Sequence, residues 1–348
     1  MRTGLIICGL TAVVQVTLGQ GTVDTVYTRA YTRILDMLEG RRQASLKTAV
    51  LEVENAYFLG QLDTQAFNGA ITRLATIAAA WANANRLTGY TAKDSPAFLR
   101  SGAVFHLMTD TVFGAPGIPL SLPFRYDTVD YFAWCDPTHM FVSRLLATHE
   151  GNCHSLPLLY VMLCHELGTN AYLAMAPMHM YIKQHSEQLG WYNTELTSAT
   201  FPSDAWVMAS GYVNTDAIRS GLYMDTLGLR KALALCLVDL AQGYQQRAAQ
   251  ADIGFVLRCC DLALAHYPAC AQALLVKAAA LASREPPVDG PTMIPVTNPA
   301  LEATLATLVN LGYREVPLEV YLAWMRALAR DPQKYANPLM PPTTSDRP

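Results

Sequence analysis

Between residues 140 and 212 the apolar pattern changes from that of one buried helix to that of three strands. Asn152 is a residue type that caps helices, and the apolar run from Cys153 to Leu167 ends at Gly168, a common helix terminator. The runs AYLAMAP, HMYIK and WYNTELT are typical of strands, and the polar turn QHSEQLG separates the last two. One helix followed by an antiparallel sheet predicts an α+β core.

The stretches on either side of this core have helical periodicity. Residues 23–112 repeat alanine, leucine and β-branched residues at three- and four-residue spacings. Residues 227–283 predict three alanine-rich helices that resemble tetratricopeptide repeats, and a Pro-rich connector leads to a further helix pair. Residues 113–139, rich in Gly, Pro and aromatic residues, predict an ordered loop with a short strand, which can form one wall of a pocket.

The first residues have the pattern of a signal peptide. Arg2 supplies a positive charge, an apolar stretch follows, and Thr17 and Gly19 place small side chains before a cleavage site at Gln20. The alternatives are a buried N-terminal helix or a membrane anchor, but the stretch is shorter than the roughly 20 apolar residues of a membrane span. The sequence therefore predicts an exported protein, periplasmic or secreted, with no stable membrane span after cleavage.

The predicted segments are a signal peptide (1–19), an N-terminal helical module (20–125), the α+β core (126–225), a tetratricopeptide-like helical region (226–335) and a disordered tail (336–348).

Composition narrows the possible functions. The formal charge of the 348-residue chain is -3 and no basic stripe occurs, which argues against nucleic acid as a partner. Seven cysteines follow the predicted signal peptide, an odd number, and most lie among Leu and Ala rather than in a disulfide framework. His149-Glu150 begins a zinc-helix pattern, but the required second histidine four residues on is replaced by Cys153. We therefore expect no metal and no cofactor.

The chemistry-bearing residues lie on the predicted core. Cys153 precedes an apolar helix, whose N-terminal dipole lowers the pKa of a thiol and stabilises a thiolate. His179 begins a strand that can bring its ring to the cysteine as a base. Asn193 or Glu195 on the next strand can orient that ring, and strand alternation places both on one face and cannot choose between them. Taken singly, each of these residues is more often structural than catalytic.

The segments GNCHSLPLLYVMLCHELG, MHMYIK and GWYNTELT together resemble the transglutaminase-like superfamily, in particular a bacterial branch whose core is followed by tetratricopeptide-like helices. The resemblance implies Cys153 as nucleophile and His179 as base within a transglutaminase-like core. The family's W-x-x-x-D-x-T motif has Glu195 in place of its aspartate. Asn193 is the alternative orienting residue, as asparagine is in papain-like enzymes.

Two functions follow as expectations. The first is a cysteine-dependent amide-bond hydrolase or acyltransferase that acts on a protein or peptide substrate through a thioester on Cys153. Hydrolysis is favoured over transfer, because transfer needs a site that excludes water. The second is an inactive scaffold that binds a protein partner through its C-terminal helices, unless those helices only cover an apolar edge of the core.

Overall fold

The computed structural model describes residues 20–130, 132–283 and 298–317, together with positions 319, 322, 323 and 326. The predicted signal peptide, the Pro-rich connector, most of the last predicted helix and the predicted tail lie outside these residues. Within the described ranges, no helix is both long and apolar enough to cross a membrane.

Helices make up the N-terminal part of the chain, as its periodicity predicted. They are α1 Gln20–Leu38, α2 Leu46–Tyr57, α3 Thr64–Ala84 and α4 Ser95–Thr109. Polar side chains define two of the starts, because Ser45 accepts a hydrogen bond from the N–H of Thr48 and Asp63 accepts one from that of Ala66. Helices α1 and α3 bury one apolar stripe and leave the opposite face in solvent, whereas α2 and α4 are buried or half-buried on nearly all sides.

The Gly- and Pro-rich stretch that follows contains more strand than the sequence predicted. Strands β1 Val112–Ala115 and β2 Ile118–Ser121 form an antiparallel hairpin, and β3 Arg125–Tyr126 pairs in parallel with β4 Glu150–Gly151. The hairpin turns at Gly117, whose positive φ of 77° suits glycine. A short 3-10 helix, η1 Pro137–Met140, ends the loop.

The α+β class is confirmed by a helix packed on a small antiparallel sheet. Its elements are α5 Val142–Thr148, α6 Ser155–Glu166, β5 Tyr172–Ala176, β6 His179–Ser186 and β7 Gly190–Thr194, with strand order β5-β6-β7. Helix α6 begins at Ser155 rather than at Cys153. Cys153 and His154 form a turn ahead of the helix, and Asn152 Oδ1 closes that turn by accepting hydrogen bonds from the N–H groups of His154 and Ser155. Strand β6 runs further than HMYIK, so the predicted polar turn is shorter.

The C-terminal part is again helical, and the three helices predicted for residues 227–283 are confirmed. The elements are α7 Asp204–Ser210, α8 Thr215–Arg219, α9 Leu229–Arg247, α10 Ile253–His266, α11 Ala271–Ala282 and α12 Pro299–Asn310. Asp252 caps α10 through two backbone N–H groups.

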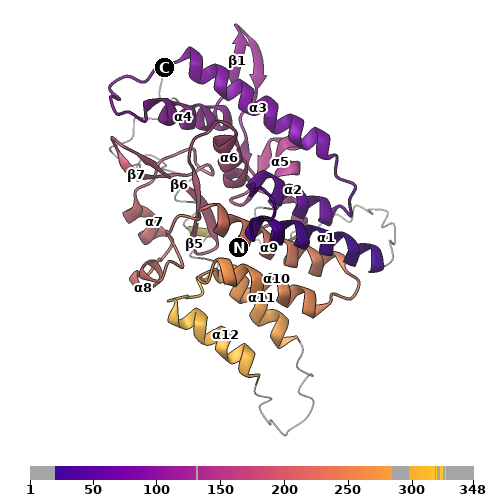
Figure 1. Cartoon of the computed structure of the whole chain (residues 1–348). Coiled ribbons are helices and arrows are strands. Elements are labelled where there is room, and N and C mark those ends of the chain that lie inside the picture. Colours follow the sequence, from indigo (N-terminus) through magenta and orange to yellow (C-terminus); the bar gives the residue numbers. More distant parts are fainter. Residues whose placement is uncertain are drawn as a thin grey trace, which may run out of the picture.

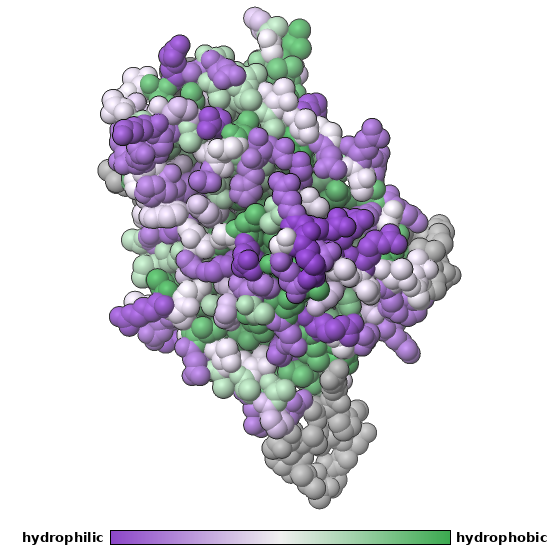
Figure 2. All heavy atoms as spheres, in the orientation of Figure 1, coloured by the Kyte–Doolittle hydropathy of each residue, from purple (hydrophilic) through white to green (hydrophobic). Residues whose placement is uncertain are grey.

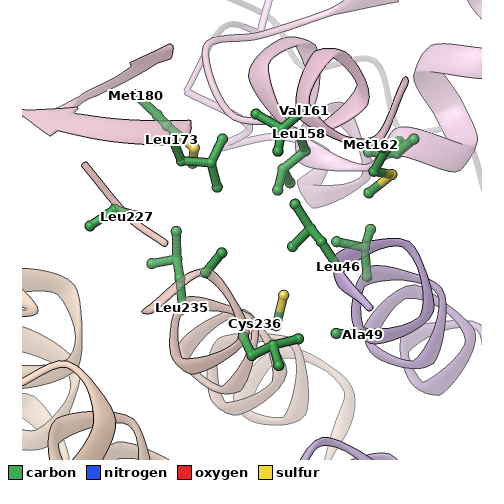
Figure 3. Close-up of a cluster of buried hydrophobic side chains, with 14 of the residues drawn as sticks. Leu46, Ala49, Leu158, Val161, Met162, Leu173, Met180, Leu227, Leu235 and Cys236 are labelled. Atoms are coloured by element: carbon green, nitrogen blue, oxygen red, sulfur yellow. The ribbon is translucent and has the colours of Figure 1, made fainter. Parts of the chain in front are cut away.

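Helix α9 joins the parts of the molecule that lie far apart in the sequence. Figure 1 shows the indigo N-terminal helices α1 and α2 beside the orange C-terminal helices, and α9 contacts both α1 and α2. In Figure 3, Leu46 of α2, Leu158 of α6 and Leu235 of α9 point into one buried cluster. The buried apolar side chains from α1 to α12 belong to a single core, so α6 is supported from both ends of the chain.

The surface is mixed in character. On the face drawn in Figure 2, hydrophilic and hydrophobic residues are interspersed, and purple residues are most numerous in the upper half.

Candidate active site

A tight turn presents Cys153 at the start of α6. Gly151 pairs with Tyr126 in the β3–β4 ladder, and a methyl group in place of its hydrogen would clash with Ser155 Oγ and the side chain of Leu145. The buried Asn152 then closes the turn by accepting the hydrogen bonds that begin α6. Glycine and asparagine before the cysteine therefore fix the direction in which the thiol projects.

His179 is placed by the two-residue turn between β5 and β6. The last residue of β5, Ala176, pairs directly with His179, so Pro177 and Met178 alone form the turn. Met178 has a φ of 56°, a left-handed backbone conformation that residues other than glycine rarely adopt. This turn fixes the backbone of His179, whose side chain is almost entirely buried.

The structure brings Cys153, His179 and Glu195 together. His179 Nε2 lies 2.6 Å from Glu195 Oε2, and the His179 ring lies close enough to the thiol of Cys153 for each to shift the pKa of the other. Because Nε2 donates to the carboxylate, Nδ1 is the ring nitrogen that remains for the sulfur. Glu195 is held in turn by Thr197, whose N–H and hydroxyl donate to Oε1 at 2.9 and 2.8 Å.

The charges of these three residues stabilise one another. Removal of water around the sulfur would raise the pKa of Cys153, but the hydrogen bond and charge of His179, and a hydrogen bond from the N–H of Met180, lower it overall. Burial would lower the pKa of His179, whereas the charge of Glu195 and the contact with Cys153 raise it to about 10. Burial would raise the pKa of Glu195, but His179 holds it below its ordinary value. Both shifts favour a thiolate paired with an imidazolium over a neutral thiol beside a neutral imidazole.

The other buried cysteines behave in the opposite way. Burial raises the thiol pKa of Cys164, Cys236, Cys259, Cys260 and Cys270. All seven cysteines of the described residues are free thiols, and Cys153 is partly exposed to solvent. Cys153 therefore combines access to solvent with the charge environment that a nucleophile needs.

Asn193 lies on the same sheet but does not contact His179. Its Nδ2 donates to the carbonyl oxygen of Pro202 at 3.0 Å and to Asp204 Oδ1 at 2.8 Å. Asp204 also pairs with Lys183 Nζ at 3.0 Å. Lys183 of β6 lies directly opposite Asn193 of β7. Of the two orienting candidates, Glu195 is the one whose side chain contacts the imidazole, and Asn193 ties β7 to the start of α7.

A second buried ion pair adjoins the thiol, and the sequence did not point to it. His154 donates from Nδ1 to the carbonyl oxygen of Met140 at 3.0 Å and from Nε2 to Asp239 Oδ1 of α9 at 3.2 Å. A ring that donates from both nitrogens is an imidazolium. Burial alone would lower the pKa of His154, but the charge of Asp239 chiefly raises it to about 9. The available signal was a single acidic residue, Asp239, inside the apolar run ALCLVDLA.

Carboxylates also fix the loop that faces the site. Glu54 of α2 accepts hydrogen bonds from the N–H groups of Val142 and Ser143, and so caps α5. Asp127 accepts N–H groups of its own turn with Oδ1 and pairs through Oδ2 with Nδ1 of the buried His139. These long-range caps hold the loop ahead of α5 as an ordered wall, as its composition predicted.

The thiol opens into a cavity of about 200 Å³. Cys153, His179 and Met178 line one side, and Asp239 and Gln242 of α9 line the other. Phe132 of the Gly- and aromatic-rich loop completes it, so that loop does form part of a pocket wall. Among the described residues, no group of histidine, cysteine and acidic side chains has the arrangement of a metal site.

Comparison of the chain with protein-family models, with curated proteins and with solved structures found no match. The case for a function therefore rests on the geometry and chemistry of the site.

Proposed function

We propose that the protein is a cysteine-dependent amide-bond hydrolase in which Cys153 is the nucleophile and His179 the general acid and base. The observation that carries this proposal is the lowered pKa of the Cys153 thiol beside the raised pKa of His179, since burial shifts the other buried cysteines the opposite way. A thiolate at neutral pH is the reactive form of cysteine.

The proposed reaction has two steps. The Cys153 thiolate attacks the carbonyl carbon of an amide, the C–N bond breaks, and the His179 imidazolium gives its proton to the leaving amine. Water then attacks the resulting thioester while His179 accepts its proton, which releases a carboxylic acid and restores the thiolate. Glu195 touches neither reacting bond, and it holds the orientation of the imidazole ring through the hydrogen bond from Nε2.

Hydrolysis is the outcome we propose, rather than transfer of the acyl group to an amine. Cys153 is partly exposed, so water reaches the thioester without a further conformational step. An amine that competes with water would need its own binding site beside the sulfur.

Membership of the transglutaminase-like superfamily and export are parts of the same proposal. The order of Gly-x-Cys, strand histidine and next-strand acid supports the family, and so do the helices that follow the core. Export is supported by residues 1–19, which have the charge and apolar pattern of a signal peptide.

The test is the pH dependence of iodoacetamide labelling at Cys153, followed by mass spectrometry of the labelled peptides. We expect rapid labelling near pH 6 and a loss in His179→Ala of roughly one to two orders of magnitude, because a free thiol has a pKa of about 8.5. The exposed Cys135 serves as an internal reference in every sample.

The matched control is His185→Ala, which removes an exposed histidine from the same strand and should leave the labelling of Cys153 unchanged. Slow labelling that is equal in wild type and His179→Ala would contradict the hydrolase. It would favour the alternative, a scaffold that binds protein partners through its C-terminal helices.

A further inference from the structure

Cys153 lies in the middle of three adjoining cavities. The central cavity, which holds Cys153 and His179, shares Phe132, His154 and Asp239 with a cavity of about 290 Å³ between α2 and α9. It also shares Met178 and Gln272 with a cavity of about 580 Å³ beside α11. We call these the α2 cavity and the α11 cavity, and Trp134 lines both of them. Because each cavity shares lining residues with the other two, we treat the three as one groove beside the thiol.

The α11 cavity exposes large apolar side chains from three separate elements. Trp134 of the aromatic loop is 72% exposed, Met178 of the β5–β6 turn 44%, and Leu275 of α11 39%. Apolar groups that gather around a hollow beside a reactive residue mark a binding surface more often than chance exposure does. The left-handed backbone of Met178 adds to this case, because strained residues cluster at binding sites.

Amide side chains of α9 line the other two cavities of the groove. Gln242 of α9 lines the central and α2 cavities, and Gln246, one turn further along α9, lines the α2 cavity. Neither amide has a hydrogen-bond partner within the described part of the chain. Each offers both a donor and an acceptor, the combination that a peptide group requires.

We propose that the groove binds an extended polypeptide segment across Cys153, with α9 and α11 as one wall and an apolar substrate side chain in the α11 cavity. This inference rests on the proposed function for the role of Cys153, and it specifies the substrate as an internal amide of a polypeptide. A small amide would need only the central cavity. The two further cavities that adjoin the central one fit a chain that continues beyond the reacting amide.

The groove also gives the C-terminal helices a definite role. The sequence left two roles open for them, a separate partner-binding surface or a cover for an apolar edge of the core. Here Asp239, Gln242, Gln272 and Leu275 face the same groove as the thiol. The helices then select the substrate of the site instead of binding an unrelated partner.

The experiment measures binding without chemistry, in the full-length Cys153→Ser protein. The probes are two pools of fluorescein-labelled decapeptides, one alternating Leu, Met or Phe with Gln and one of Ser and Gly, and the readout is fluorescence anisotropy. We expect the apolar pool to bind and the Ser/Gly pool to bind at least about tenfold more weakly, because only the apolar pool can bury side chains in the α11 cavity.

Variants in the Cys153→Ser background locate the contact. Leu275→Asp should weaken binding of the apolar pool by about tenfold, since it places a charge in the α11 cavity. The matched control is Leu305→Asp, an equally exposed leucine (47%) of α12 that lines none of the three cavities. It should leave the Kd unchanged, and thermal melting checks that both variants fold.

A second pair of variants covers the case in which Leu275→Asp fails to fold. Trp134→Ala should weaken binding, whereas Trp191→Ala, which removes a half-exposed tryptophan of β7 outside the groove, should not. No binding of the apolar pool, or equal losses in the groove and control variants, would overturn the proposal. Because the assay needs no reactive thiol, its failure is distinct from a failure of the labelling test for the hydrolase.

Discussion

Glu195 occupies the position where the resemblance implies an aspartate, and its longer side chain still contacts the imidazole. Its two carboxylate oxygens have different partners. Oε2 accepts a hydrogen bond from His179 Nε2, and Oε1 accepts two from Thr197. A buried carboxylate with one lone histidine partner would pay a large desolvation cost. The hydrogen bonds from Thr197 offset that cost and fix the angle at which Glu195 meets the ring.

Replacing Glu195 should raise the pKa of the Cys153 thiol. In Glu195→Gln the imidazolium loses its buried counter-charge, so His179 is protonated less and stabilises the thiolate less. The charge of Glu195 also raises the pKa of Cys153 directly, but this effect is weaker than that of His179, so we expect the indirect effect to prevail. We expect iodoacetamide labelling of Cys153 at pH 6 to slow by about tenfold for each unit that the thiol pKa rises. The labelling profile from pH 5 to 10 measures the shift.

Asn193→Ala is the matched control, because Asn193 of β7 lies two residues before Glu195 and its side chain donates to Pro202 and Asp204. It should keep the labelling profile and lose about 1–2 kcal/mol of folding stability through its buried hydrogen bonds. A labelling profile that shifted equally in both variants would show that Glu195 has no special relation to the imidazole.

The residues of the site differed in how far the sequence could predict them. Cys153 and His179 follow local signals, a helix start and a strand start, which short-range patterns indicate well. Alternation could not choose between Asn193 and Glu195, because both lie on one face of the strand. The choice depends on the loop after β7, where Glu195 pairs with Thr200 and turns toward the histidine. That loop has no local sequence signature.

At the scale of elements, a side chain from one helix caps another. Glu54 on α2 supplies the acceptors for the first N–H groups of α5, although the two helices are far apart in the sequence. Burial raises the pKa of Glu54 to about 7, and the hydrogen bonds from Ser143 and Val142 offset this only in part. Its ionisation therefore opposes folding.

Folding stability therefore depends on pH through Glu54. An acid with a pKa of 4.5 when unfolded and about 7 when folded binds more protons in the folded state between these values. The stability is full below pH 4.5 and is lost as the pH rises through 7, by about 3 kcal/mol in total.

Glu54→Gln should remove that slope, since glutamine does not ionise but keeps a carbonyl oxygen for the cap. Urea unfolding at pH 4.5, 6 and 7.5 checks the difference between variant and wild type. A difference that stays constant across the three pH values would contradict the assignment.

Elements were predicted best where one pattern runs over many residues. The helices of residues 227–283 and the helix–strand–strand–strand order of the core have such patterns. The predicted start of α6 at Cys153 lies two residues before the observed one, because Cys153 and His154 form a turn, and boundaries of this kind are the least certain part of a helix prediction. The β1–β2 hairpin was underestimated, because Gly and Pro indicate a turn without indicating how far strands extend from it.

At the scale of the whole molecule, the His154–Asp239 pair ties the catalytic turn to α9. We expect Asp239→Asn to cost about 3 kcal/mol at pH 6, because it leaves a buried imidazolium without its counter-charge. The pKa of His154 is 6.5 when unfolded and about 9 when folded, so the contribution is full below pH 6.5 and is lost as the pH rises through 9. Urea unfolding at pH 6 and pH 10 measures it.

Asp261→Asn is the control for this prediction, since it breaks the more exposed pair between Asp261 of α10 and Lys277 of α11. Such a pair contributes about 1 kcal/mol or less, so the control should change little at either pH. A loss in Asp239→Asn that did not diminish at pH 10 would mean that the His154 charge is not its cause.

Contacts between residues far apart in the sequence explain why the arrangement of the helices could not be predicted. The sequence suggested three modules in succession, but the buried apolar residues from α1 to α12 form a single core with α9 at its centre. Asp239 and Glu54 are single acids inside apolar helices, and only the fold brings both to the wall of one cavity. Periodicity shows that a residue is buried, but not which residue it faces.

The position of α9 has a consequence for the order in which the chain is made. Synthesis proceeds from the N-terminus, so the turn that carries Cys153 leaves the ribosome well before residues 229–247 do. Until those residues arrive, His154 has no carboxylate, and the hollow in front of the sulfur lacks its second wall. A nascent or truncated chain therefore has the thiol without the groove, and only a chain completed past α11 can bind a polypeptide across the thiol.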